Sequence, residues 1–185
     1  MLRRADYDFE ASFPTAVFVA AARGHDASSA SPLIGRTVEG GTPDECANVF
    51  VDEGGRALFR DFCSAFKLPP DKAAEGIAVR TSYIDELYVK AYREGTRQFV
   101  GVASGMDARP WRLPLNVSDG ETTVYELDCP SGVRFKESRV EMLDQTKIPL
   151  RCGKRIPVEA DLSDAVAWPA ALIAAVGIRN NNDTA

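Results

Sequence analysis

The spacing of apolar and polar residues divides the chain into segments, and residues 98–113 stand out, with the sequence QFVGVASGMDARPWRL. Apolar, β-prone residues open this stretch and small residues follow them. The pattern predicts a buried parallel strand over 98–102 that ends in a turn of small residues. Backbone N–H groups approach a ligand closely at such strand ends, which makes the turn a candidate cofactor site. Taken alone, the pattern is equally typical of an ordinary tight turn.

The segment before this strand has the strongest helical periodicity in the chain. Its spacing predicts a helix over 77–93 that Gly95 ends. The expected buried face carries Val79, Tyr83, Ile84, Leu87, Tyr88 and Ala91. The residues expected to point outward are Asp85, Glu86, Lys90 and Arg93. Helix, glycine turn and strand then follow in the order of an α/β layer fold.

Two more strands are predicted, over 122–127 and 155–160, each followed by a helix, over 131–144 and 164–176. Before residue 77, the patterns predict a short helix over 15–23, an irregular loop over 24–43 and a helical segment over 49–66 that Pro69 and Pro70 end. Three strands with their helices form half of a doubly wound sheet, with an N-terminal helical lid. Strand 98–102 is then expected to be an exposed apolar edge.

Composition and charge narrow the classes of function. The 185 residues are 45% hydrophobic and 26% charged, which is typical of a soluble globular domain. A net charge of −5 disfavours partners such as nucleic acid or an anionic membrane. No apolar run has the ~20 residues of a membrane span, and no signal peptide is recognised. A small molecule or a protein is the expected partner.

The cysteines show no pattern of a metal or redox site. Cys46, Cys63, Cys129 and Cys152 form no C-x-x-C pair, and His25 is the sole histidine. We therefore expect no bound metal, reduced thiols in a cytoplasmic protein, and a solvated loop position for the histidine.

Acidic residues end the second and third predicted strands. Asp128 follows Gly105 by 23 positions, close to the ~20 residues that separate a glycine turn from a ribose-binding carboxylate. Glu126 is a second candidate, and the alternative is that both residues only cap the next helix. Asp161 and Leu162 end the third strand, where a carboxylate and an apolar side chain suit an adenine ring.

Arg80 lies near the start of the predicted helix 77–93. Its guanidinium is either a solvated surface charge or a group placed to pair with a ligand carboxylate. No nucleophile paired with a base is recognisable, so no catalytic residue is assigned.

In order and spacing, these motifs resemble those of S-adenosylmethionine-dependent methyltransferases of the leucine carboxyl methyltransferase type and their bacterial relatives. The motifs are RT at 80–81, ASGMDARPWRL at 103–113, YELDCP at 125–130 and ADL at 160–162. The resemblance implies a Rossmann-like class I methyltransferase fold of which this chain holds the N-terminal half. Residues 1–75 would form the helical lid region, and residues 76–185 a partial cofactor-binding domain.

The cofactor implied by the resemblance is S-adenosyl-L-methionine. The implied binding residues are Arg80, Ala103, Gly105, Asp128, Asp161 and Leu162. The arginine would pair with the methionine carboxylate, the turn would approach the same part through its backbone, Asp128 would bind the ribose, and the last two residues would hold the adenine.

The chain departs from the family pattern in two ways. Ala103 replaces the first turn glycine, where a positive φ would strain alanine and reduce cofactor affinity. The sequence also stops before the family's next strand, so we expect a fragment or a partner chain that completes the sheet.

The function expected from the resemblance is O-methyl transfer to a carboxyl or hydroxyl group by direct displacement. One alternative is a catalytically dead module that binds cofactor or a partner. Another is a nicotinamide-dependent Rossmann oxidoreductase, which is weakened because the full G-x-G-x-x-G is absent.

Overall fold

Three parallel strands form the centre of the chain. The computed structural model describes residues 14–116 and 122–177. The strands are β1 (Gln98–Val102), β2 (Thr123–Asp128) and β3 (Lys154–Glu159), in the order β1-β2-β3. The predicted α/β class and the three predicted strands are confirmed, each strand to within one residue at either end.

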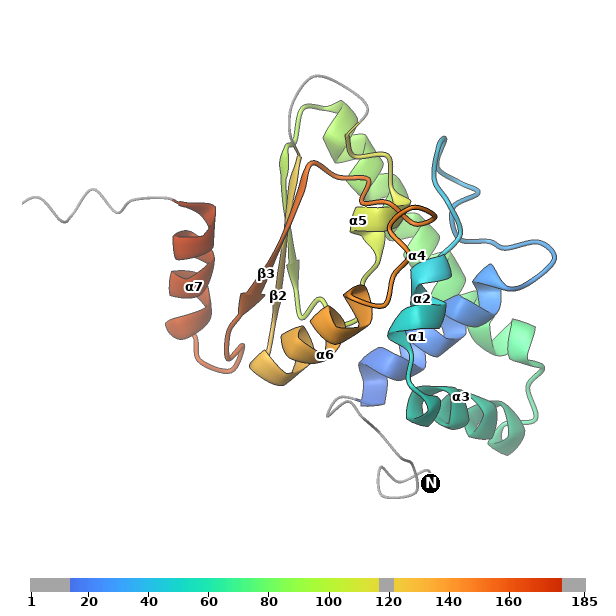
Figure 1. Ribbon diagram of the computed structural model, residues 1–185. Helices are drawn as coiled ribbons and strands as arrows, with labels where there is room; N and C mark the ends of the chain where they lie inside the picture. Colours follow the sequence, from blue (N-terminus) through green and yellow to red (C-terminus); the bar gives the residue numbers. More distant parts are fainter. Residues whose placement is uncertain (1–13, 117–121, 178–185) are drawn as a thin grey trace, which may run out of the picture.

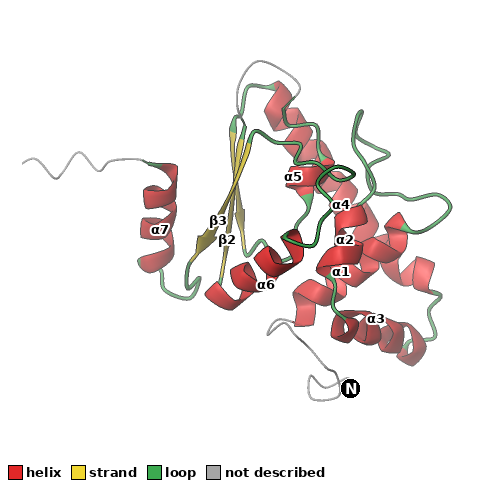
Figure 2. Cartoon of the chain, viewed as in Figure 1, coloured by secondary structure: helices red, strands yellow, loops and turns green. Residues whose placement is uncertain are grey.

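Helices cover both faces of this sheet, and on one side further helices lie outside the first helical layer (Figure 1). They are α1 (Pro14–Ala27), α2 (Glu45–Phe50), α3 (Glu53–Ala65), α4 (Pro70–Arg93), α5 (Arg109–Arg112), α6 (Pro130–Val140) and α7 (Ala167–Val176). Helix α7 lies on one face, and α4, α5 and α6 lie on the other. Figure 2 shows the three N-terminal helices stacked outside that second layer.

Side chains of β2 alternate between the two layers, as the pleat requires. Tyr125 and Leu127 are buried with Val158 of β3 under α7. Val124 points the other way and joins Phe99 of β1 in a cluster with α4. The sheet is therefore buried on both faces around β2, as in a doubly wound fold.

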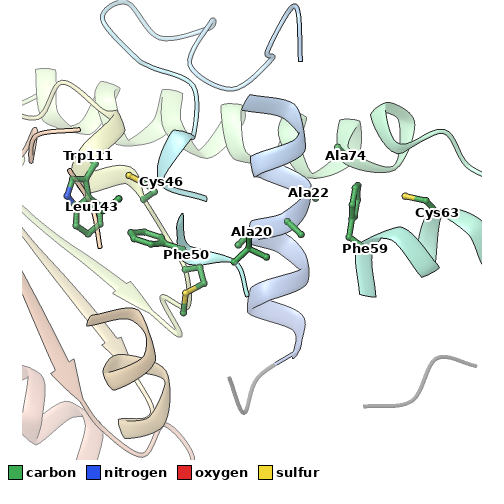
Figure 3. Close-up of a cluster of buried hydrophobic side chains, with 13 residues drawn as sticks. Ala20, Ala22, Cys46, Phe50, Phe59, Cys63, Ala74, Trp111 and Leu143 are labelled. Carbon is green, nitrogen blue, oxygen red and sulfur yellow. The ribbon is translucent and has the colours of Figure 1, made fainter. Parts of the chain in front are cut away.

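The largest hydrophobic cluster joins the N-terminal helices to the sheet layer. In Figure 3, Ala20 of α1 lies between Phe50 of α2 on one side and Phe59 of α3 on the other. Trp111 of α5 and Leu143 after α6 belong to the same cluster. The N-terminal helices therefore share a core with the residues that follow β1 and β2.

The expected division at residue 75 falls inside α4, which runs without a break from residue 70 to 93. The preceding helix ends at Ala65, before Pro69 and Pro70 as predicted. Pro70 itself occupies the first turn of α4, where the missing N–H is not needed. The division into two regions stays a prediction.

Two capping aspartates explain why the predicted helical segment 49–66 is two helices. Asp44 accepts a hydrogen bond from the Ala47 N–H at 3.1 Å and caps α2. Asp52 accepts one from the Gly55 N–H at 2.7 Å and caps α3. Val51 is extended after α2, and the Asp52 cap then begins α3.

The predicted face of α4 is wrong in part, because Glu86, Lys90 and Arg93 are exposed as expected but other positions are reversed. Asp85, expected outside, is fully buried, whereas Val79 and Tyr83, expected inside, are 59% and 62% exposed. The buried side of the helix carries small and polar residues such as Ala78 and Thr81. Apolar periodicity failed here because the inward carboxylate of Asp85 binds buried arginines, as described below.

Strand β1 is an edge of the sheet, as expected. In the described part of the chain it pairs with β2 alone. Val100 and Val102 are 41% and 53% exposed on the face that α7 covers over the other two strands. None of the described helices is long and apolar enough to cross a membrane.

Candidate functional site

A cavity of about 770 Å³ opens where β1 ends, between α1 and α4. Pockets of roughly 300–1,000 Å³ suit cofactors and small ligands. Four of the six predicted binding residues line it, namely Arg80, Ala103, Gly105 and Asp128. The remaining two, Asp161 and Leu162, are not part of this lining.

The turn after β1 has the strained backbone expected from the sequence. Ala103 has a φ of 53° and Gly105 a φ of 48°. The Ser104 N–H donates to the Leu127 carbonyl at 3.0 Å, which ties the turn to β2. A Cβ at Gly105 would lie only 3.2 Å from the Cβ of Ala16 in α1. Helix α1 therefore packs directly on the turn and forms one wall of the cavity.

Asp128 connects the end of β2 to this turn. Its Oδ2 accepts a hydrogen bond from the Gly105 N–H at 2.6 Å, and its Oδ1 accepts one from the Cys129 N–H at 2.8 Å. An ionised carboxylate has about four acceptor sites, so it retains capacity for ligand hydroxyls. Cys129 is the N-cap residue of α6, which has no side-chain cap hydrogen bond, so Asp128 contacts the start of the helix without capping it.

Glu126, the second ribose candidate, is bound elsewhere. It is buried, and its Oε2 lies 2.8 Å from Lys136 Nζ and 2.7 Å from an Arg155 nitrogen. It lies two positions before the strand end, faces α6 and does not line the cavity.

Asp161 closes a turn just after β3. Its Oδ1 accepts hydrogen bonds from the Ser163 N–H at 2.9 Å and hydroxyl at 2.7 Å, and these bonds lower the pKa of the carboxyl. Leu162 is partly buried and packs against the cluster under α7. The Ala160 N–H donates to the Asp128 carbonyl at 3.0 Å, so the two strand ends are adjacent.

Arg80 is exposed on α4 and reaches the same cavity as the turn. It forms no ion pair within the described residues. The neighbouring Thr81 hydroxyl donates to the Ile77 carbonyl at 2.7 Å, which keeps that hydroxyl on its own helix. The guanidinium is therefore the group on this wall that is available to an anionic ligand.

Comparison with known proteins identifies the family of the chain. A family model described as leucine carboxyl methyltransferase matches residues 16–185. The chain belongs to the leucine carboxyl methyltransferase family. The fold and the order of motifs in the sequence had indicated the same family.

Similar proteins come from mycobacteria and carry the name "Putative S-adenosyl-L-methionine-dependent methyltransferase". One from Mycolicibacterium paratuberculosis is 37% identical over 85% of this chain and 28% of its own length. One from Mycobacterium avium is 36% identical over 85% of this chain and 49% of its own length. One from Mycobacterium tuberculosis is 38% identical over 67% of this chain and 40% of its own length. The chain thus spans about half the length, or less, of the curated relatives it matches.

Sequence reasoning missed a buried ionic network beneath the turn of this family member. Arg109 lies 2.5 Å from Asp107 and 2.8 Å from Asp85. Arg112 lies 2.9 Å from Asp85 and 3.5 Å from Asp44. The signals were present as the D-x-R-x-x-R spacing after the turn and the aspartate in the middle of α4.

Close to the cavity, the negative charge of Asp107 in this network is balanced by neighbouring cations. Burial acts to raise the pKa of Asp107, but Arg109 and Lys136 overcome it and hold the pKa below its usual value. Asp107 therefore stays ionised beside the turn. Removing Asp85 would take one of two carboxylate partners from each arginine and leave the buried network with an excess of positive charge.

Proposed function

We propose that this chain forms the S-adenosyl-L-methionine site of an O-methyltransferase. The observation that carries the proposal is the single cavity that gathers Arg80, the turn at Ala103 and Gly105, and Asp128. Family membership and the names of the relatives support the same cofactor.

Each predicted residue in the cavity, taken in sequence order, suits one part of this cofactor. The exposed guanidinium of Arg80 suits the methionine carboxylate, because charge-assisted bonds to carboxylates are strong and directional. The small residues of the turn allow close backbone approach. Asp128 retains acceptor capacity for two vicinal ribose hydroxyls.

The adenine would lie toward the end of β3. Asp161 and Leu162 follow the strand that pairs with β2, and the Ala160 N–H bond to the Asp128 carbonyl brings the two strand ends together. An adenine held there would extend beyond the cavity that the other four residues line. This assignment is separable from the others by substitution of Asp161 alone.

Bound S-adenosyl-L-methionine supplies an activated methyl group on a positively charged sulfur. The chain's own contribution is to orient the ligand and to exclude water. Val19 and Ile84 give the cavity an apolar wall next to the turn. A carboxylate acceptor needs no general base, which fits a site in which none was recognised. We therefore propose a carboxyl or hydroxyl group, on a small molecule or a protein, as the acceptor.

We also propose that another polypeptide segment completes the sheet at β1. Val100 and Val102 of β1 are exposed apolar residues. Helix α4 also exposes a row of apolar residues, which are Val79, Tyr83 and Leu87. An open apolar strand edge favours pairing with an added strand. The chain covers 49% of the length of the Mycobacterium avium relative, so that protein has further chain from which such a segment could come.

Adding the other half of the Mycobacterium avium relative as a separate chain tests this pairing. We expect a 1:1 complex by sedimentation, and we expect Val102→Lys on β1 to prevent it. A monodisperse monomer that unfolds cooperatively and takes up no second half would contradict the proposal.

Free thiols support placement in the cytoplasm. The described residues include four unpaired cysteines, of which Cys46, Cys63 and Cys152 are buried. Free cysteines are typical of reducing compartments. Retention of all four thiols in protein isolated from its source would agree with this placement, and a native disulfide would contradict it.

Calorimetric titration with S-adenosyl-L-methionine, followed by an assay for release of S-adenosylhomocysteine, tests the proposed function. Arg80→Met should weaken binding about tenfold or more, because it removes a charge-assisted bond. Arg93→Met on the same helix is the matched control and should leave affinity unchanged. Binding without turnover, even with the second half present, would favour the dead module over the enzyme. Absence of binding would contradict the proposal.

A further inference from the structure

The turn that lines the cavity has two carbonyls held from opposite sides. Arg23 of α1 donates to the Met106 carbonyl, and Lys136 of α6 donates to the Asp107 carbonyl at 2.6 Å. Both cations are buried, with 8% and 2% of the residue exposed. In the described part of the chain, these carbonyls receive no backbone donor. Two consecutive peptide groups are thus fixed by side chains from separate helices.

Each cation is held in place by a carboxylate behind it. Arg23 Nε lies 2.9 Å from Asp44, which also caps α2. Lys136 Nζ lies 2.8 Å from Glu126 on β2. A buried cation with a carboxylate on one side and a carbonyl on the other has little freedom to move.

The turn needs such support because its backbone conformation is unfavourable. Ala103 has a positive φ three positions before Met106, whereas Gly105 adopts its positive φ without a steric cost. An L residue in the left-handed region costs about 1–2 kcal/mol, so the conformation persists only where its surroundings impose it. The hydrogen bond from Gly105 to Asp128 fixes one end of the turn, and the two cations fix the other.

We propose that Arg23 and Lys136 are positioning residues that hold the turn in the shape that binds the cofactor. Lys136 does not line the cavity and acts through the Asp107 carbonyl alone, whereas Arg23 lines the cavity as well as holding the Met106 carbonyl. The link to affinity rests on the proposed function, whereas the effect on the turn does not. Because Arg23 belongs to α1, the N-terminal helix is part of the site and not merely a cover over it.

Hydrogen exchange of the free protein tests the effect on the turn. Lys136→Met should speed exchange of the amides of 104–108 about tenfold, since a bond to a charged group is lost. Arg155→Met is the matched control, because Arg155 is paired with the same Glu126, is similarly buried and does not touch the turn. Its turn amides should exchange as in the wild type. Equal exchange in both variants would overturn the proposal.

Arg23→Met, a substitution on α1, tests the same claim. It decides the question if circular dichroism shows that Lys136→Met does not fold. It should also speed exchange of the turn, and Arg23→Lys, which keeps a cation, should restore part of the protection. If the Met106 and Asp107 amides are unaffected in Arg23→Met, the proposal is wrong.

Cofactor titration of the same variants measures positioning separately from stability. Lys136→Met and Arg23→Met should weaken S-adenosyl-L-methionine binding about tenfold at a temperature where all variants are folded. Arg155→Met should bind as the wild type even if it melts earlier. If the wild type binds no cofactor, the proposed function fails, and hydrogen exchange still decides whether the two cations hold the turn. Unchanged affinity beside faster exchange would refute the positioning role.

Discussion

The carboxylate of Asp128 accepts a 2.6 Å hydrogen bond from the backbone N–H of Gly105, which joins the end of β2 to the turn after β1. One side chain thereby shapes the turn and faces the proposed ribose position. A substitution at Asp128 therefore affects two functions at once, and the choice of replacement separates them.

Asp128→Asn should lose cofactor affinity while keeping the turn. The amide oxygen still accepts the Gly105 N–H, but the amide nitrogen cannot accept the Cys129 N–H, and the charge that strengthens bonds to ribose hydroxyls is removed. We expect binding about tenfold weaker or more, with a free energy of unfolding within about 1 kcal/mol of the wild type. Asp128→Ala should lose both and be less stable by a further ~1–3 kcal/mol. Calorimetry and urea unfolding give the two quantities, and full affinity in Asp128→Asn would rule out the ribose assignment.

Ala103→Gly should stabilise the protein. Ala103 has a φ of 53°, which glycine adopts without the Cβ penalty, although glycine also gains entropy in the unfolded state. The net gain should be about 0.5–1 kcal/mol, or roughly 1–4 °C in melting temperature. Ala170→Gly, on the exposed side of α7, is the control and should lower the melting temperature. Destabilisation by Ala103→Gly would show that the turn is not strained in this way.

Asp85→Ala should be among the most destabilising substitutions in α4. The carboxylate lies 2.8 Å from Arg109 and 2.9 Å from Arg112. Without it, Arg109 keeps only Asp107 and Arg112 keeps only Asp44, which is 3.5 Å away, so each buried guanidinium loses one of its two carboxylates. Breaking a buried ion pair by removing one partner costs about 3–5 kcal/mol. Glu86→Ala, at the exposed neighbouring position, should change stability by less than about 0.5 kcal/mol. Similar losses in the two variants, measured by urea unfolding, would contradict the burial of Asp85.

Thiol labelling should distinguish the cysteines by pH. Burial raises the pKa of Cys46 to about 12 and that of Cys152 to about 11. The thiolate is the reactive form, so both stay protonated and inert at about pH 8 and become reactive only as the pH rises toward those values. Cys129 is half-exposed beside Asp128 and should label first in the native protein, more slowly once cofactor is bound. Mass spectrometry after iodoacetamide treatment identifies the sites, and rapid labelling of Cys46 would disagree with its environment.

The strand ends were predictable because local chemistry determines them. Small residues after a parallel strand favour a tight turn, and an acidic residue at the end of the next strand can reach that turn. The turn at 103–105 and Asp128 were therefore predictable from their spacing in the sequence. The unusual φ of Ala103 followed from its position in a glycine motif.

The face of α4 was not predictable from periodicity, because a partner distant in sequence determines it. Asp85 is buried only because Arg109 and Arg112, which follow the turn, form ion pairs with it. Val79 and Leu87 are exposed because no described element covers that side of the helix. The bonds from Arg23 and Lys136 to the turn likewise join residues 83 and 29 positions apart, and no local pattern indicates them.

The position of S-adenosylhomocysteine in a crystal structure of the complex tests the central claim most directly. The account predicts its carboxylate at Arg80, its sulfur beside the turn at Ala103 and Gly105, and its ribose hydroxyls on Asp128. A ligand bound in another part of the chain, or one that leaves Asp128 without a ribose contact, would contradict it.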